Sequence, residues 1–165
     1  MFERFLHHRN DFLSLVPGAF SNMFLYQYAL YINMKVSEIM HAVTRVPSNA
    51  TISEAARIMD NKLIGSVLIE ENNKIVGIVT ERDILRKVVA KGESAEIVRV
   101  KDIMSYPLVS IDANEDALEA SRIMDEKRIR RLVVTENGKV VGKVTANSIS
   151  RNLKYLLSRR SEIYV

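Results

Sequence analysis

Cysteine is absent from this chain of 165 residues, and histidine is scarce. Without cysteine, the chain has no disulfide scaffold, thiolate zinc site or cysteine nucleophile. The three histidines, His7, His8 and His41, all precede the best-organised part of the sequence. This placement argues against a histidine metal site or a Ser-His-Asp relay. We therefore expect no catalytic residue and no metal site, and a protein that is not an enzyme.

Charge of one sign is only slightly in excess. The net charge is +4, and the apolar and charged fractions, 47% and 27%, are those of an ordinary globular protein. Residues 151–165 alone contribute roughly +3. Proteins that read DNA usually present a wider basic surface, so the composition argues against nucleic acid as a partner. The lack of cysteine and the overall composition favour a cytoplasmic location.

Aromatic residues are rare outside the N-terminal segment, residues 1–33. This segment holds all five phenylalanines and three of the six tyrosines. Its apolar stretch, 19–32, is too short and too polar for a membrane span, and no signal-peptide pattern precedes it. Two hypotheses remain open. The segment is either a helix that binds a partner or stabilises a dimer, or an upstream extension before a start at Met34.

An internal repeat organises the chain after Met34. A shift of about 65 residues aligns Val46–Arg86 with Ile111–Arg151 without a gap, and about 18 of 41 positions are identical. The agreement continues through predicted helices, strands and turns. The sequence therefore divides into an N-terminal segment (1–33), a first repeat (34–99), a second repeat (100–151) and a basic C-terminal helix or tail (152–165).

Each repeat predicts the same series of elements. A short extended piece, 44–46 or 108–111, precedes a helix that opens with a capping box, Thr51-x-x-Glu54 or Asp116-x-x-Glu119. Two β-branched runs follow, separated by Asn72-Asn73 or Asn137-Gly138, pairs that favour a two-residue hairpin. The runs are 66–70 and 75–79 in the first copy and 131–135 and 140–144 in the second. Thr80 and Thr145 then open the final helices.

These elements predict a mixed α/β (α+β) fold. Each repeat is a strand, a helix, a hairpin and a second helix. A repeat of roughly sixty residues buries too little surface to be stable alone. We expect the two repeats to be related by a pseudo-twofold axis and to pack face to face through their sheets.

The duplicated pattern resembles the CBS domain pair, also called a Bateman module. The resemblance covers about Met34 to Arg151 and depends on three strings in the expected order. These are Gly77-Ile78-Val79-Thr80-Glu81-Arg82-Asp83, Asp102-Ile103-Met104, and Ile129-Arg130-Arg131-Leu132-Val133-Val134. It implies a module that binds an adenosine-containing ligand between its two repeats.

The residues between Gly77 and Asp83 allow two interpretations. Thr80 is either a helix cap complemented by Asp83, contributing about 0.5–2 kcal/mol of stability, or part of a ligand site. A carboxylate at this position can accept hydrogen bonds from two ribose hydroxyls, and a helix start favours a nearby phosphate. The resemblance implies that the aspartate holds the ribose and that the threonine contacts the ribose-phosphate side. It also implies that the opposite repeat supplies the adenine wall and the basic contacts.

Carried onto this sequence, the resemblance predicts two sets of site residues. The first set is the nucleotide site and comprises Ile78, Thr80, Asp83, Val109, Arg130 and Arg131. The second set is weaker and comprises Thr44, Gly65, Ser66, Thr145 and Ser148.

The two sets are unequal because Ser148 stands where the first repeat has Asp83, and a neutral serine cannot make the charge-assisted pair of hydrogen bonds. All the useful charge is expected in the first set. We therefore expect one competent site per chain. Arg130 and Arg131 are adjacent on a strand and cannot both point inward, and both could also be exposed charges in weak salt bridges.

The sequence thus predicts a regulatory sensor that needs no cofactor. The expected ligand is AMP, ADP, ATP or an S-adenosyl compound, and binding is expected to change the arrangement of the repeats, which an unidentified regulated protein reads. The resemblance also implies a homodimer. Two alternatives stay open: a structural or partner-binding scaffold with vestigial sites, and a nucleic-acid-associated regulator that acts through the basic tail.

Overall fold

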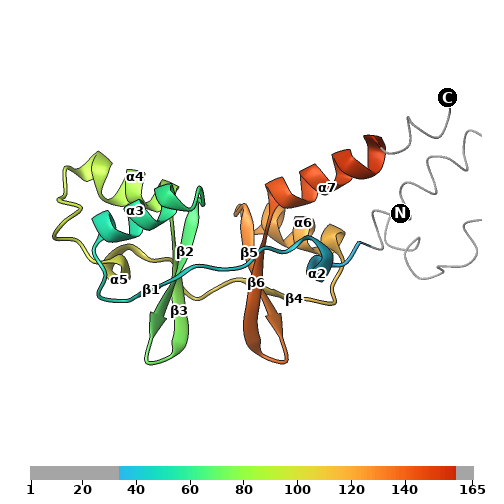
Figure 1. Cartoon of the computed structure of the whole chain (residues 1–165), viewed down its shortest axis with the longest axis horizontal. Coiled ribbons are helices and arrows are strands. Elements are labelled where there is room, and N and C mark those ends of the chain that lie inside the picture. Colours follow the sequence, from blue (N-terminus) through green and yellow to red (C-terminus); the bar gives the residue numbers. More distant parts are fainter. Residues whose placement is uncertain (1–33, 159–165) are drawn as a thin grey trace, which may run out of the picture.

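The computed structural model describes residues 34–158, with side chains up to Asn152. The predicted N-terminal segment (1–33) and the end of the basic tail (159–165) lie outside the described residues. Within 34–158 the chain forms two lobes side by side, each with a three-stranded sheet and helices (Figure 1). No helix in this range is long and apolar enough to cross a membrane. The predicted mixed fold of two similar repeats is confirmed.

The first lobe contains the sheet β1-β2-β3, in which β1 is parallel to β2 and β2 is antiparallel to β3. Its elements are β1 (Arg45–Pro47), α3 (Ile52–Asn61), β2 (Ser66–Glu71), β3 (Lys74–Thr80), α4 (Glu81–Lys87) and the 3-10 turn η3 (Val89–Lys91). The second lobe repeats this order with β4 (Ser110–Asp112), α6 (Ala117–Glu126), β5 (Arg131–Glu136), β6 (Lys139–Thr145) and α7 (Ala146–Ser158). The predicted boundary between residues 151 and 152 therefore falls inside α7.

Both hairpins close as the asparagine-rich pairs predict. Asn72 and Asn73 have φ values of 49° and 59°, and Asn137 and Gly138 have φ values of 50° and 74°. A two-residue turn with positive φ at both positions matches the twist of the two strands that it joins. The tips of the two hairpins lie on the same side of the molecule (Figure 1).

Only one of the two predicted capping boxes on the longer helices forms. The Thr51 hydroxyl accepts from the Glu54 amide at 3.1 Å, and the Glu54 carboxylate accepts from the Thr51 amide at 2.7 Å. The Thr51 hydroxyl also donates to this carboxylate, and the two hydrogen bonds that the carboxylate accepts from Thr51 lower the pKa of Glu54. The prediction for the second helix is wrong: in the part of the chain that the structure describes, the Asp116 side chain makes no cap hydrogen bond. Its carboxylate instead accepts from Lys35 Nζ at 2.8 Å.

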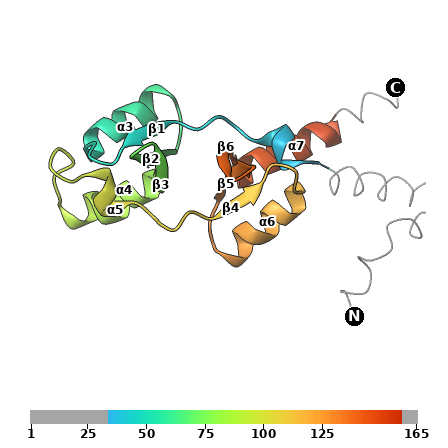
Figure 2. The same cartoon turned by 90° about the horizontal axis from the view of Figure 1, so that it is seen from below.

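Two short helices that the sequence pattern did not predict connect the lobes. Helix α2 (Val36–Ile39) lies at the start of the first repeat in sequence, yet Val36 and Ile39 lie in the core of the second lobe. Helix α5 (Val100–Ile103) lies at the start of the second repeat, yet its apolar residues lie in the core of the first lobe. Figures 1 and 2 show α2 beside α7 and α5 beside α4, with a strand-like segment crossing between the lobes after each short helix. Each lobe is therefore completed by the other repeat.

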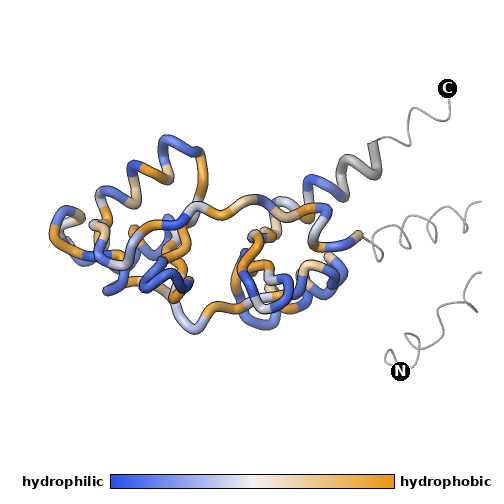
Figure 3. Tube along the Cα trace, turned by 60° about the horizontal axis from the view of Figure 1, so that its bottom comes forward, coloured by the Kyte–Doolittle hydropathy of each residue, from blue (hydrophilic) through white to orange (hydrophobic). Residues whose placement is uncertain are grey.

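Hydropathy is distributed evenly over the two lobes. Apolar and polar stretches interleave along the whole described chain in Figure 3 and do not gather in one lobe. The two apolar cores have matching members, such as Ala55, Met59 and Val79 in the first lobe and Ala120, Met124 and Val144 in the second. This equivalence is what a duplicated sequence requires.

The exchange of short helices predicts which lobe loosens when α2 is damaged. Ile39→Ala removes buried apolar volume and should lower the free energy of unfolding by about 2–5 kcal/mol. Hydrogen exchange should rise first in residues 111–149 of the second lobe, because the Ile39 side chain packs there. Ser37→Ala on the exposed face of the same helix is the control. Earlier loss of protection in residues 46–88 would contradict the exchange.

Candidate functional site

Thr80 and Asp83 of the first predicted set meet at the start of α4. The Asp83 Oδ2 atom accepts from the Thr80 hydroxyl at 2.7 Å and from the Thr80 amide at 3.1 Å, while the Asp83 amide donates to Thr80 Oγ1 at 3.2 Å. The other carboxylate oxygen, Oδ1, lies 3.0 Å from Lys87 Nζ. The capping role is therefore present, and the Asp83 side chain keeps 16% of its surface exposed.

Thr145 and Ser148 of the second set form the same local geometry at the start of α7. The Ser148 hydroxyl oxygen accepts from the Thr145 amide at 2.8 Å, and the Ser148 amide donates to Thr145 Oγ1 at 3.0 Å. Ser148 also donates to the Thr145 carbonyl at 2.8 Å and is buried. The turn before α7 therefore has the same backbone geometry as the turn before α4. Its third helical residue, however, carries a neutral hydroxyl where the first lobe has a carboxylate.

Arg131 extends from the second lobe to the beginning of α4 in the first lobe. Its Nη1 atom donates to the Gly65 carbonyl at 2.5 Å, and the same carbonyl accepts from the Glu81 amide at 3.3 Å. Burial and the neighbouring Arg130 lower the pKa of Arg131, whereas Glu81 and Asp83 act in the opposite direction. The guanidinium remains charged at neutral pH.

The contact between Arg131 and Gly65 joins residues that the sequence placed in separate sets. Ser66 and Arg131 are the first residues of the equivalent strands β2 and β5, and these strand ends meet where the lobes face each other. A Cβ atom added at Gly65 would lie 2.8 Å from Glu81 Oε2 and 3.7 Å from Arg131 Nη2. Glycine at position 65 therefore leaves room for both charged side chains.

Lys143 is the residue that the sequence analysis missed. It occupies the position on β6 that corresponds to Ile78 on β3, and only 8% of its surface is exposed. Its Nζ atom lies 3.3 Å from Ser66 Oγ and 3.4 Å from the Ser66 carbonyl oxygen. Burial and the charge of Arg131 lower the pKa of Lys143. A charged residue inside the otherwise apolar stretch between Val140 and Val144 was the available signal.

The expectation that all the useful charge lies in the first set did not take Lys143 into account. Lys143 adds a cation beside Ser66 of the second set, and Arg131 lies close enough to influence its pKa. The sequence comparison of the two sets contrasted Asp83 with Ser148. That comparison did not include position 143, where Lys143 replaces the equivalent Ile78 of the first repeat.

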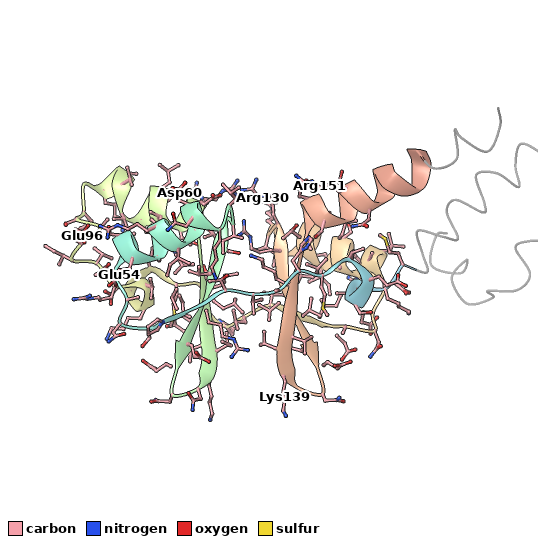
Figure 4. All side chains as sticks on the ribbon, in the orientation of Figure 1. Glu54, Asp60, Glu96, Arg130, Lys139 and Arg151 are labelled. Carbon is pink, nitrogen blue, oxygen red and sulfur yellow. The ribbon has the colours of Figure 1, made fainter. Side chains whose placement is uncertain are left out.

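The remaining predicted residues differ in how close they lie to this interface. The backbone of Ile78 pairs with Ser105 on the segment that crosses between the lobes, and Val109 packs against the core of the second lobe. Thr44 is half-buried, and its carbonyl accepts from the Leu68 amide at 2.9 Å. Arg130 is exposed at the edge where the two lobes meet (Figure 4). Arg131 therefore points inward and Arg130 outward, as the strand alternation requires.

The arrangement offers groups for binding. The Asp83 carboxylate of the first lobe and the Arg131 guanidinium of the second lobe both lie near the start of α4. The Thr80 hydroxyl donates to the Asp83 carboxylate there. Such groups can hold a ligand that carries hydroxyls at one end and negative charge at the other. Among the described residues, no cluster of histidine, aspartate or glutamate could hold a metal ion.

Comparison with known proteins places these residues in a family context. The CBS domain profile matches residues 36–90 and 100–155. The CBS domain-containing protein YhcV of Bacillus subtilis is 33% identical over 110 residues, 67% of this chain and 78% of its own length. An uncharacterized protein of Methanopyrus kandleri is 33% identical over 121 residues, which are 73% of this chain but 62% of that longer protein.

Solved structures agree with this match. The crystal structure of an uncharacterized conserved protein from Pyrococcus horikoshii superposes with a TM-score of 0.70 at 27% identity. The superposition covers 73% of this chain and 92% of that one. The family profile matches both lobes and begins at residue 36.

The capping geometry yields a direct test at Thr80. Thr80→Ala removes the hydroxyl that accepts from the Asp83 amide, and it should lower the free energy of unfolding by about 1 kcal/mol in urea denaturation. Thr80→Ser keeps the hydroxyl and should retain most of that stability. Equal losses in both variants would show that the methyl group, and not the cap, stabilises this turn.

Proposed function

Because the chain belongs to the CBS-domain family and carries two CBS domains in tandem, a regulatory and ligand-binding module, we propose that it is a sensor of an adenosine-containing ligand. The ligand class is AMP, ADP, ATP or an S-adenosyl compound. It binds at the interface between the lobes, on Ile78, Thr80 and Asp83 of the first lobe and on Val109, Arg130 and Arg131 of the second.

One observation carries this proposal: the Gly65 carbonyl accepts hydrogen bonds from both Arg131 of the second lobe and Glu81 at the start of α4. This shared acceptor brings the guanidinium to the turn that contains Thr80 and Asp83. A ligand there contacts both lobes at once. A nucleotide has the matching chemistry, with a ribose diol for the carboxylate and phosphate for the arginines.

Asp83 has capacity left for the ribose. An ionised carboxylate offers about four acceptor positions, and the Asp83 carboxylate uses two on Thr80 and one on Lys87. A ribose hydroxyl can take the remaining position on Oδ1, and a second hydroxyl can displace the Lys87 ammonium. Lys87 keeps a second partner, the Ile103 carbonyl at 2.6 Å, so it is not left unpaired.

The same contacts supply a route from binding to signal. Arg131 links the lobes through Gly65, so a ligand that draws the guanidinium toward its own phosphate alters the contact between the lobes. The ligand shifts the arrangement only as far as it binds one arrangement more tightly than the other. A partner protein would then read the changed surface.

A homodimer is the proposed assembly. Leu85 and Val89, one turn apart near the end of α4 and in the following 3-10 turn, are 59% and 61% exposed. Large apolar side chains exposed in neighbouring turns of the chain are typical of a contact surface, and two copies can cover them by packing these segments together.

A scaffold with vestigial sites is the second candidate. The observation that favours it is the complete capping box of Thr80 and Asp83, which gives both residues a structural role without any ligand. The two candidates differ in whether adenosine compounds stabilise the folded chain.

The first test is thermal unfolding with AMP, ADP, ATP, S-adenosylmethionine and adenosine. A ligand at 100 times its dissociation constant adds about 2.7 kcal/mol, which should raise Tm by roughly 5–10 °C in a chain of this size. The rise should vanish in Asp83→Ala. Titration calorimetry should give one site per chain, and two equal sites would contradict the proposal.

Glu54→Ala is the matched control for Asp83→Ala. Glu54 occupies the same third position of a threonine capping box, but on α3 (Figure 4). Both variants lose equivalent cap hydrogen bonds, so their Tm values without ligand should fall similarly. Only Asp83→Ala should lose the ligand-induced rise. A rise that persists in Asp83→Ala, or no rise with any compound, would favour the scaffold.

The dimer is tested by mass in solution. The double variant Leu85→Glu, Val89→Glu should behave as a monomer in sedimentation analysis, whereas the unaltered chain should show twice the mass of 18.8 kDa. Charges placed on an apolar contact face disfavour association because they must be desolvated there. The exposed Lys101→Glu variant is the control and should remain a dimer. An unaltered chain that sediments as a monomer would rule out this assembly.

A further inference from the structure

Two cations, Arg131 and Lys143, lie at the interface between the lobes; the charges of Glu81 and Asp83 act to raise the pKa of Arg131, but neither carboxylate is in ion-pair contact with Arg131 or Lys143. Both belong to the second lobe, and both contact the first lobe at adjacent residues, Gly65 and Ser66. Within the described residues, neither cation forms an ion pair. Their partners are two carbonyl oxygens and one hydroxyl, all of them neutral.

The Lys143 contacts are weak for a buried ammonium. Distances of 3.3 Å and 3.4 Å to Ser66 exceed the usual range of N–H···O hydrogen bonds, about 2.7–3.2 Å. An ammonium group has three N–H donors, and Ser66 offers it only two oxygens. A buried charge is ordinarily paired, because removing it from water without a counter-charge is unfavourable. Lys143 is thus held in a place where its charge is poorly compensated.

Arg131 makes this position more unfavourable, since two like charges lie close together. The positive charge of Arg131 contributes, after burial, to the lowered pKa of Lys143. An anion that contacts both groups removes the repulsion and supplies the missing acceptors at the same time. The first repeat has Ile78 in the equivalent position, so the chain offers this pair of cations once.

We propose that Arg131 and Lys143, with the hydroxyl of Ser66, bind one phosphate group at the interface between the lobes. The phosphate is either free inorganic phosphate or the phosphoryl group of a nucleotide. Its tetrahedral oxygens can accept from a guanidinium and an ammonium together, and charge-assisted hydrogen bonds of this kind are about twice as strong as neutral ones. Lys143 is then the residue that selects for the phosphate group. The nucleotide form of this inference rests on the proposed function, and the free-phosphate form does not.

The test compares Lys143→Met with Lys139→Met by thermal unfolding and titration calorimetry. Lys139 is exposed at the start of the same strand and lies at the hairpin end of the second lobe, far from Arg130 (Figure 4). The probes are inorganic phosphate, adenosine and AMP, with potassium chloride at matched ionic strength as the reference. Lys143→Arg keeps the charge and serves as the rescue variant. Far-UV circular dichroism verifies that each variant is folded. If Lys143→Met does not fold, Lys143→Ile takes its place, because isoleucine is the residue at the equivalent position 78 of the first repeat.

Free phosphate as the source predicts a saturable rise of Tm with phosphate beyond that with chloride. The affinity should fall about tenfold or more in Lys143→Met, and it should be kept in Lys139→Met and largely restored in Lys143→Arg. A nucleotide phosphoryl group as the source predicts that AMP binds more tightly than adenosine. That preference should shrink about tenfold or more in Lys143→Met while adenosine affinity stays unchanged.

The inference is overturned if Lys143→Met changes neither the phosphate affinity nor the preference for AMP over adenosine. It is also overturned if neither phosphate nor AMP binds the unaltered chain. Failure of the proposed function has a different signature, because adenosine then does not bind while the phosphate response still depends on Lys143. Asp83→Ala separates the two further, since it should abolish adenosine binding while any phosphate response still depends on Lys143.

Discussion

The reciprocal burial of two short helices is the constraint on which the rest of the structure depends. Val36 and Ile39 complete the core of the second lobe, while Val100 and Ile103 complete the core of the first. Each lobe therefore lacks part of its core without the other repeat. Because the chain must cross between the lobes after each short helix, the two sheets are held facing each other (Figures 1 and 2). The contacts of Arg131 and Lys143 with the first lobe follow from that arrangement.

Duplication has preserved the backbone and changed the charge. The turns at Thr80 and Thr145 have the same capping hydrogen bonds, yet one contains a carboxylate and the other a hydroxyl. At the contact between the lobes, the charged side chains belong to the second lobe: Arg131 and Lys143 are the cations, and the first lobe contributes neutral oxygens. Electrostatic interactions in a partly buried place are stronger than on the surface, so these few substitutions decide what the interface can bind. The two halves of a symmetric frame have become chemically distinct.

Local patterns predicted much of the fold because their physical causes are local. Asn137-Gly138 defines a hairpin since both residues accept positive φ, and Thr51 with Glu54 caps a helix since the partners are three residues apart. The pattern at Asp116 failed because a distant residue, Lys35, competes for the carboxylate. The helices α2 and α5 were missed for a related reason: each has four residues, too few for an apolar period to be evident. Their burial depends on the opposite repeat.

By itself, the sequence determined the two repeats, the order of their elements, their hairpin turns and the pairing of Thr80 with Asp83. All of these depend on residues close together in the chain or on an alignment of the chain with itself. Only the tertiary structure decided which lobe each short helix completes, that Arg131 contacts Gly65, and that Lys143 is buried beside Ser66. The contacts of Arg131 and Lys143 join residues more than sixty positions apart. Whether a cation is exposed or buried, and whether a counter-charge lies near it, depends on how the two lobes meet, and no local pattern records that.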